Sequence, residues 1–179
     1  MNKNTKTFKL ATLGLLSAIS ILLVAVIHFP IFPWAGFLEY DPADIPILLG
    51  TLLYGPMAGL VMTVVVSVIQ GMTVSAQSGI VGIVMHIFAT GSLVLVSGII
   101  YKKKPTIKGL WAGLGLGALT MIVVMVLLNL VVTPIFWGMP IQAVIDLLLP
   151  AIIPFNAIKA ILNAGIALLL YKRIKNIIK

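Results

Sequence analysis

Long apolar runs are the feature that most restricts how this chain can fold. Four stretches, 10–29, 81–101, 110–132 and 154–171, contain at most one Lys, Arg, Asp or Glu each. Each has about 20 residues, the length that an α-helix needs to cross the hydrocarbon core of a bilayer. Only 9% of the 179 residues are charged, against about 25% in soluble domains. We therefore expect a single membrane domain over residues 1–179, with the first apolar run kept as a helix because no signal-peptide cleavage site follows it.

A fifth apolar stretch, residues 45–70, is interrupted by Gly55-Pro56 and could form one helix or two. Basic residues gather before the first run, at 102–108 and after the last run, and such residues collect on the cytoplasmic side. All three clusters share one side only if 45–70 crosses the membrane twice. The sequence therefore predicts an all-α membrane protein with six transmembrane helices and cytoplasmic N- and C-termini. The expected helices are 10–29, 45–54, 56–70, 81–101, 110–132 and 154–171.

The same topology places the acidic residues on the outer side. Glu39, Asp41, Asp44 and Asp146 are all expected at or near the outer face, with Asp146 in a loop. The two long outer segments, 30–44 and 133–153, are rich in aromatic residues and proline. We expect them to fold back as lids or interfacial segments rather than to be disordered.

Lys159 is the most informative polar residue, because a charged side chain within a span usually faces a cavity or a ligand. The alternative is that its ammonium group reaches the headgroups. Asn156 and Asn163 share its helical face, and Asn129 is expected at a similar depth. Asparagine offers both a donor and an acceptor to a ligand, but it can also bond neighbouring helices. We also expect Lys159→Ala to leave expression normal, because removing a charge from within the membrane eases insertion.

Other patterns are less specific or are absent. Glycines 109, 113 and 117 predict a close-packing helix face, and Gly14 with Ala18 forms a second small-residue step. His28 and His86 are interpreted as structural, and Gln70 is uninformative. The chain has no cysteine, no phosphate-binding loop that would allow ATP hydrolysis and no catalytic constellation. We predict no enzyme activity, no metal site and no nucleic-acid partner.

Several strings resemble a known family. Six helices in under 200 residues are similar to the S components of energy-coupling factor (ECF) importers. The string Phe37-Leu38-Glu39-Tyr40-Asp41, followed by Asp44-Ile45-Pro46, resembles the riboflavin-specific members. Asn129-Leu130 and the run from Pro154 to Lys159 resemble their other signature positions.

The resemblance implies a function. An S component captures its vitamin outside the bacterial plasma membrane and works with a transmembrane coupling subunit and two ATP-hydrolysing subunits. The resemblance assigns substrate contacts to Leu38, Tyr40, Asn129, Asn156 and Lys159, and more weakly to Glu39, Asp41 and Asn163. It assigns docking of the coupling subunit to Gly14 and Ala18, where glycine replaces the usual first alanine.

The expected ligand is riboflavin, or alternatively FMN, carried as cargo rather than held as a cofactor. Other vitamins, namely folate, thiamine and pantothenate, remain alternatives within the same fold. A small intramembrane enzyme that modifies lipid is the alternative from another class.

Overall fold

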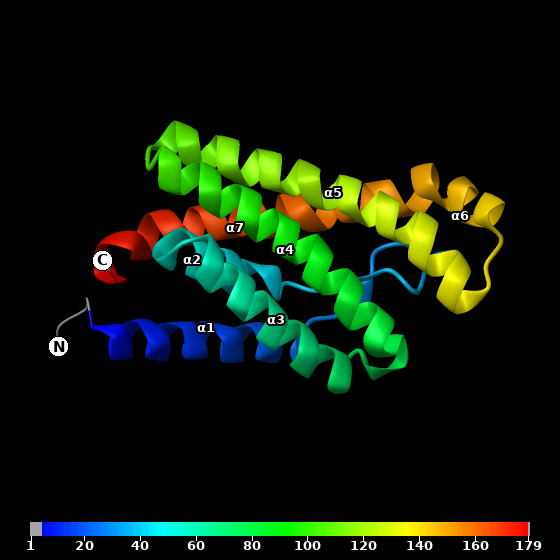
Figure 1. Ribbon diagram of the computed structural model, residues 1–179, viewed down its shortest axis with the longest axis horizontal. Coiled ribbons are helices and arrows are strands. Elements are labelled where there is room, and N and C mark those ends of the chain that lie inside the picture. The colour runs from blue at the N-terminus through cyan, green and yellow to red at the C-terminus, as the bar shows by residue number, and fades with distance from the viewer. Residues whose placement is uncertain (1–4, 179) are drawn as a thin grey trace.

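The computed structural model describes residues 5–178, with side chains up to residue 175, and is almost entirely helical (Figure 1). The helices are α1 (Lys6–Val26), α2 (Asp44–Tyr54), α3 (Pro56–Met72), α4 (Gly79–Lys103), α5 (Ile107–Trp137), α6 (Ile141–Leu147) and α7 (Ile153–Ile178). Short elements join them: strands β1 (Phe29–Pro30) and β2 (Glu39–Tyr40), a 3-10 turn η1 (Ala76–Ser78) and a π-helical turn η2 (Leu148–Ile152). The predicted all-α bundle of six main helices is confirmed, and α6 is an additional short helix.

The stretch 45–70 divides at the predicted place. α2 ends at Tyr54, and Gly55 adopts a positive φ of 98°, which glycine tolerates because it lacks a Cβ. Pro56 then begins α3, where its missing N–H costs nothing. Two antiparallel helices replace one long span.

α2 is short but does not have to reach both membrane surfaces by itself. Eleven residues extend over about 16 Å, roughly half of the hydrocarbon thickness. Nearly every residue of α2 is buried, among α1, α3, α4 and α7. Four longer helical segments among the described residues are long and apolar enough to span a membrane, whereas α2 and α3 are shorter apolar helices.

The segment before α2 enters the bundle from the end opposite the start of α1 and the end of α7 (Figure 1). α2 occupies the half of the molecule that holds the start of α1 and the end of α7 (Figure 1). Residues 27–43 lead into it, and within them β1 pairs antiparallel with β2, Phe29 opposite Tyr40. Because the segment follows this path, Tyr40, Asp41 and Asp44 are buried in the interior of the bundle.

The segment 133–153, which is expected on the outer side, is more helical than the sequence predicts. α5 continues past the predicted end at 132, through Pro134, to Trp137, and Gly138 closes it in the left-handed conformation with φ 64°. Asp146 lies in α6 and not in a loop. At the other end of the chain, α1 stops at Val26 rather than at 29, because the backbone becomes extended at Ile27 before β1.

The close-packing glycine face predicted on the fifth helix is confirmed, and its partner is α4. A Cβ on Gly113 would lie 2.9 Å from the Ser97 carbonyl oxygen, and one on Gly117 would lie 2.8 Å from the Leu93 carbonyl oxygen. Both obstacles are backbone atoms and cannot rotate away. Glycine is therefore required for this helix–helix distance.

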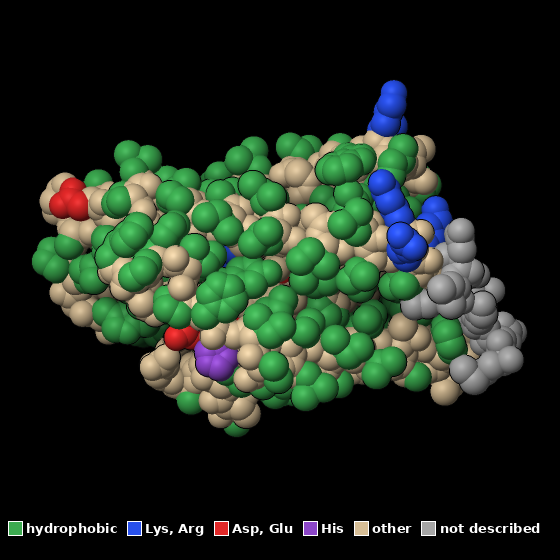
Figure 2. All heavy atoms as spheres, turned by 180° about the vertical axis from the view of Figure 1, so that it is seen from behind, with side chains coloured by type: hydrophobic (Ala, Val, Ile, Leu, Met, Phe, Trp, Pro, Cys, Tyr) green, Lys and Arg blue, Asp and Glu red, His purple; other side chains and the backbone are tan. Residues whose placement is uncertain are grey.

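Charged side chains separate along the bundle (Figure 2). The start of α1, the α4–α5 turn and the end of α7 lie at one end (Figure 1), which gathers the basic clusters. Lys3 and Lys179 lie outside the described residues. That this end faces the cytoplasm remains a prediction.

Two of the acids that are expected at or near the outer face are buried within the bundle. Asp146 belongs to an exposed stretch, but Asp41 is only 5% exposed and Asp44 is fully buried. Buried carboxylates require partners, which the interior of the bundle supplies.

Candidate functional site

A cavity of about 790 Å³ opens between the ends of the helices opposite the basic end. Its walls come from the end of α1 and the residue after next, His28, from residues 36–39 and 41, from the end of α3 and the start of α4, and from the second half of α5, α6 and the start of α7. This volume falls within the range of about 300–1,000 Å³ that is common for small-molecule sites. The cavity is therefore the principal candidate site.

Much of the cavity wall is apolar. Its apolar residues include Leu38, Met121, Met125 and Phe155. Of these, Leu38, Met121 and Phe155 are buried in the protein. Methionine side chains adapt their shape to a ligand because they are unbranched and polarizable. Such walls suit a flat aromatic ring.

Lys159 and Asp41 form a buried ion pair at the cavity. The Lys159 ammonium donates to Asp41 Oδ2 at 2.7 Å, and the two residues are 7% and 5% exposed. Asp41 Oδ1 accepts from the backbone N–H of Ala43 at 3.0 Å. Lys159 therefore does not reach for the headgroups. Lys159→Ala would leave Asp41 buried without its countercharge, so the normal expression of this variant stays a prediction.

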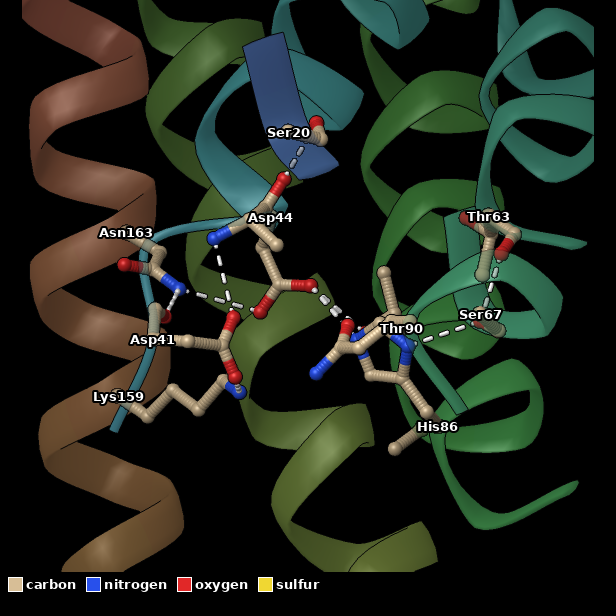
Figure 3. A network of polar contacts seen from close by, with 12 residues as sticks. Ser20, Asp41, Asp44, Thr63, Ser67, His86, Thr90, Lys159 and Asn163 are labelled. Atoms are coloured by element: carbon tan, nitrogen blue, oxygen red, sulfur yellow. Dashed lines mark hydrogen bonds and ion pairs between the residues drawn. The ribbon is translucent and has the colours of Figure 1, made fainter. Parts of the chain in front are cut away.

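A second carboxylate, Asp44, lies behind this pair (Figure 3). Its Oδ1 accepts from the Thr90 hydroxyl at 2.8 Å, and its Oδ2 accepts from the Asn163 amide at 3.1 Å. The same Asn163 amide donates to the Asp41 carbonyl oxygen. Asn163 thus connects the two acidic residues and ties α7 to the start of α2.

Tyr40 supports the network from the loop. Its hydroxyl donates to Asn163 Oδ1 at 2.9 Å. Burial, together with the neighbouring Asp41 carboxylate, raises the pKa of the Tyr40 phenol, so that it stays protonated and able to donate. Neither Tyr40 nor Asn163 is among the cavity-lining residues, so both hold the site from behind.

The other predicted substrate contacts do line the cavity: Leu38, Glu39, Asp41, Asn129, Asn156 and Lys159. Asn129 donates one N–H to the Met125 carbonyl oxygen, and Asn156 donates one to the Ile152 carbonyl oxygen, both at 2.8 Å. A carboxamide has two N–H donors, so each retains one for a ligand. These side chains, with the Lys159 ammonium, form one polar wall of the cavity.

The sequence reasoning missed residues on the other side. His86 and Gln70, interpreted as structural and uninformative, both line the cavity. So does Trp137, whereas Trp34 is 69% exposed and stacks on Phe32. A polar side chain in an apolar helix is a signal of function. With only one such residue on a helix, however, the sequence does not indicate whether it faces the cavity or a neighbouring helix.

The small residues of α1 face outward. Gly14 and Ala18 are exposed, and a Cβ on Gly14 would meet nothing within 4 Å. The chain thus leaves this face uncovered, and its role in docking a partner remains a prediction. No cluster of three or more potential metal ligands occurs among the described residues.

Comparisons with known proteins agree with this architecture. Residues 8–171 match the model of the family described as "ECF transporter, substrate-specific component". This chain is an ECF S component. It is also similar to a solved structure described as "Structure and mechanism of the S component of a bacterial ECF transporter", with a TM-score of 0.84 and 33% identity over 98% of this chain and 99% of that one.

Two curated relatives match this S component over nearly their full lengths. The riboflavin transporter FmnP of Bacillus subtilis is 30% identical, covering 95% of this chain and 93% of the relative. The riboflavin transporter RibU of Staphylococcus aureus is 33% identical, covering 96% and 92%. The S component is thus a transport protein and not an enzyme, with several helices in the bacterial plasma membrane.

Proposed function

We propose that this S component binds riboflavin in the cavity from the outer side of the membrane and passes it inward. The observation that carries the proposal is the similarity, over nearly the whole chain, to relatives that are themselves named riboflavin transporters. The proposed ligand contacts are Leu38, Asn129, Asn156 and Lys159, with Glu39 and Asp41 beside them.

The chemistry of the cavity supports this ligand. Riboflavin has a flat apolar ring, a pyrimidine edge with donors and acceptors, and a chain of hydroxyl groups. Apolar walls would take the ring, and the remaining N–H groups of Asn129, Asn156 and Lys159 would meet the acceptors of the pyrimidine edge. Riboflavin would be cargo here, since transport requires no redox step. FMN would carry an anionic phosphate at the end of the hydroxyl-bearing chain.

Titration of the purified protein with riboflavin tests the proposal. Flavin fluorescence should be quenched with 1:1 stoichiometry and a Kd in the nanomolar range, about −12 kcal/mol near 1 nM. FMN, folate, thiamine and pantothenate serve as competitors. Tight binding of one of these vitamins in place of riboflavin would refute the ligand assignment while leaving the family unchanged.

We further propose that separate subunits supply the energy: a transmembrane coupling subunit and two ATPases. The chain has no phosphate-binding loop of its own. The buried acids, which could couple transport to an ion, already have partners within the protein. Asp41 is bonded by Lys159 and the Ala43 N–H. Asp44 is bonded by Thr90 and Asn163.

Reconstitution in liposomes tests this second part. The chain alone should bind riboflavin but not accumulate it, with or without a proton or sodium gradient. Accumulation should require the coupling subunit, the ATPases and ATP. Uptake driven by a gradient through the chain alone would contradict the proposal.

A further inference from the structure

A second, smaller cavity lies at the basic end of the bundle, between the α4–α5 turn and the end of α7 (Figure 1). Its volume is about 210 Å³, which is below the range that is common for whole small-molecule ligands and suits a single chemical group. No described residue lines both this cavity and the larger one. The second cavity is therefore separate from the proposed riboflavin site.

The second cavity has a buried floor and an exposed basic rim. Tyr101, Leu110 and Tyr171 line it and are more than nine-tenths buried. The hydroxyl groups of the two tyrosines lie 3.0 Å apart and bond each other. Lys172 and Lys175 also line the cavity but are exposed, and their spacing of three residues puts them on one face of α7. Two flexible cationic side chains can therefore reach one group held over the floor.

The lysines of this rim have no countercharge in the described part of the protein. The ion pairs among the described residues join α4 or α7 to residues 41–44 within the bundle, and none includes a residue of the basic end. The acids of the chain all lie elsewhere, Asp41 and Asp44 in the interior, Glu39 at the larger cavity and Asp146 in α6 at the opposite end (Figure 1). An anion that neutralises this rim has to come from outside the chain.

Apolar surface beside the cavity favours a lipid over a free anion. Ile107 lines the cavity and Trp111 lies one turn further along α5, and these side chains are 50% and 59% exposed. The Lys172 ammonium lies 5.8 Å from the centre of the Trp111 ring. Tryptophan is typical of the headgroup level of a membrane. A phosphate held by the lysines would thus have apolar surface next to it for the acyl chains of the same molecule.

We propose that the second cavity binds the phosphodiester headgroup of an anionic phospholipid, such as phosphatidylglycerol, through Lys172 and Lys175. Basic pockets between membrane helices are suited to such headgroups. The two ammonium groups would donate to phosphate oxygens. Thr106 and Ile107, at the N-terminal end of α5, also line the cavity, and the start of a helix adds partial positive charge. This site does not depend on which vitamin the larger cavity binds.

Trp111 can report lipid binding at this site. In a full-length chain with Trp34→Phe and Trp137→Phe it is the only tryptophan. This protein is reconstituted in phosphatidylcholine bilayers with increasing fractions of bromine-labelled phosphatidylglycerol or, in parallel, bromine-labelled phosphatidylcholine, which quench a nearby tryptophan. Phosphatidylglycerol should bind beside Trp111 roughly 5- to 30-fold more tightly than phosphatidylcholine, the effect of one or two lysine contacts at about fivefold each.

Two double variants separate the cavity from the general charge of the basic end. Lys172→Gln with Lys175→Gln should reduce the preference for phosphatidylglycerol to less than about twofold. Lys103→Gln with Lys108→Gln is the matched control, because these lysines are exposed at the same end but do not line the cavity, and it should keep the preference. Quenching by bromine-labelled phosphatidylcholine should be the same in all variants, which reports that Trp111 keeps its place at the bilayer.

Three results would overturn this proposal. The first is equal quenching by the two labelled lipids when all lysines are present. The second is an equal loss of preference in the two double variants, because the basic end would then attract anionic lipid only as a diffuse charge. The third is relief of the quenching by millimolar inorganic phosphate at constant ionic strength, because the cavity would then take a free anion and not a lipid headgroup.

Discussion

The Asp41–Lys159 pair allows a double-mutant cycle that tests whether the site is held together by charge pairing. Lys159→Met keeps most of the side-chain volume but removes the charge. Asp41→Asn keeps an oxygen that can accept from the Ala43 N–H. Both residues are more than nine-tenths buried and their charged atoms lie 2.7 Å apart, so that either change alone strands a buried charge.

The expected magnitude follows from that burial. Stranding one partner of a buried pair costs about 3–5 kcal/mol of unfolding free energy. If the two residues acted independently, the double variant would lose the sum of the two single losses. If the two residues pair, the double variant should lose no more unfolding free energy than either single variant. The difference from the sum of the single losses is then a coupling energy of about 3 kcal/mol or more.

Unfolding by SDS from mixed micelles, followed by tryptophan fluorescence without any ligand, measures these differences. Lys172→Met is a matched control, because Lys172 is an exposed lysine of the same helix, with its ammonium 5.8 Å from the centre of the Trp111 ring. It should change stability little. Single losses that add up in the double variant, or a Lys159→Met variant as stable as the wild type, would refute the pairing argument.

Three further predictions concern the ligand, the helix packing and the partner. Asn156→Ala should weaken riboflavin binding by about 1–3 kcal/mol in a fluorescence titration, because a buried acceptor on the ligand loses its donor. Gly117→Ala should lower the unfolding free energy by about 1–3 kcal/mol, because the added methyl group meets the Leu93 carbonyl oxygen; Gly115→Ala, with open space around it, should not. Ala18→Trp, on the exposed small face of α1, should block ATP-driven uptake in liposomes but leave riboflavin affinity unchanged; equal loss of both would argue against docking there.

Hydropathy and charge alone determined the architecture of this protein. Lipid contact requires long apolar helices, so the number of main helices could be counted along the chain. The division at Gly55-Pro56 followed from keeping the lysines on one side, and the close-packing face of α5 followed from glycine spacing, although not its partner α4. These features depend on local composition, which a single sequence shows directly.

The tertiary structure decided which polar groups meet. Asp41 and Lys159 are 118 positions apart, and no periodicity in the chain indicates that the segment before α2 enters the bundle and buries Asp41 beside α7. The same packing places Tyr40 and Asn163 behind the cavity and leaves one N–H donor each on Asn129 and Asn156 at its wall. A sequence shows which side chains can form hydrogen bonds. Only the packed helices show which of these groups are satisfied within the protein and which are left for a ligand, because that depends on distances between segments far apart in the chain.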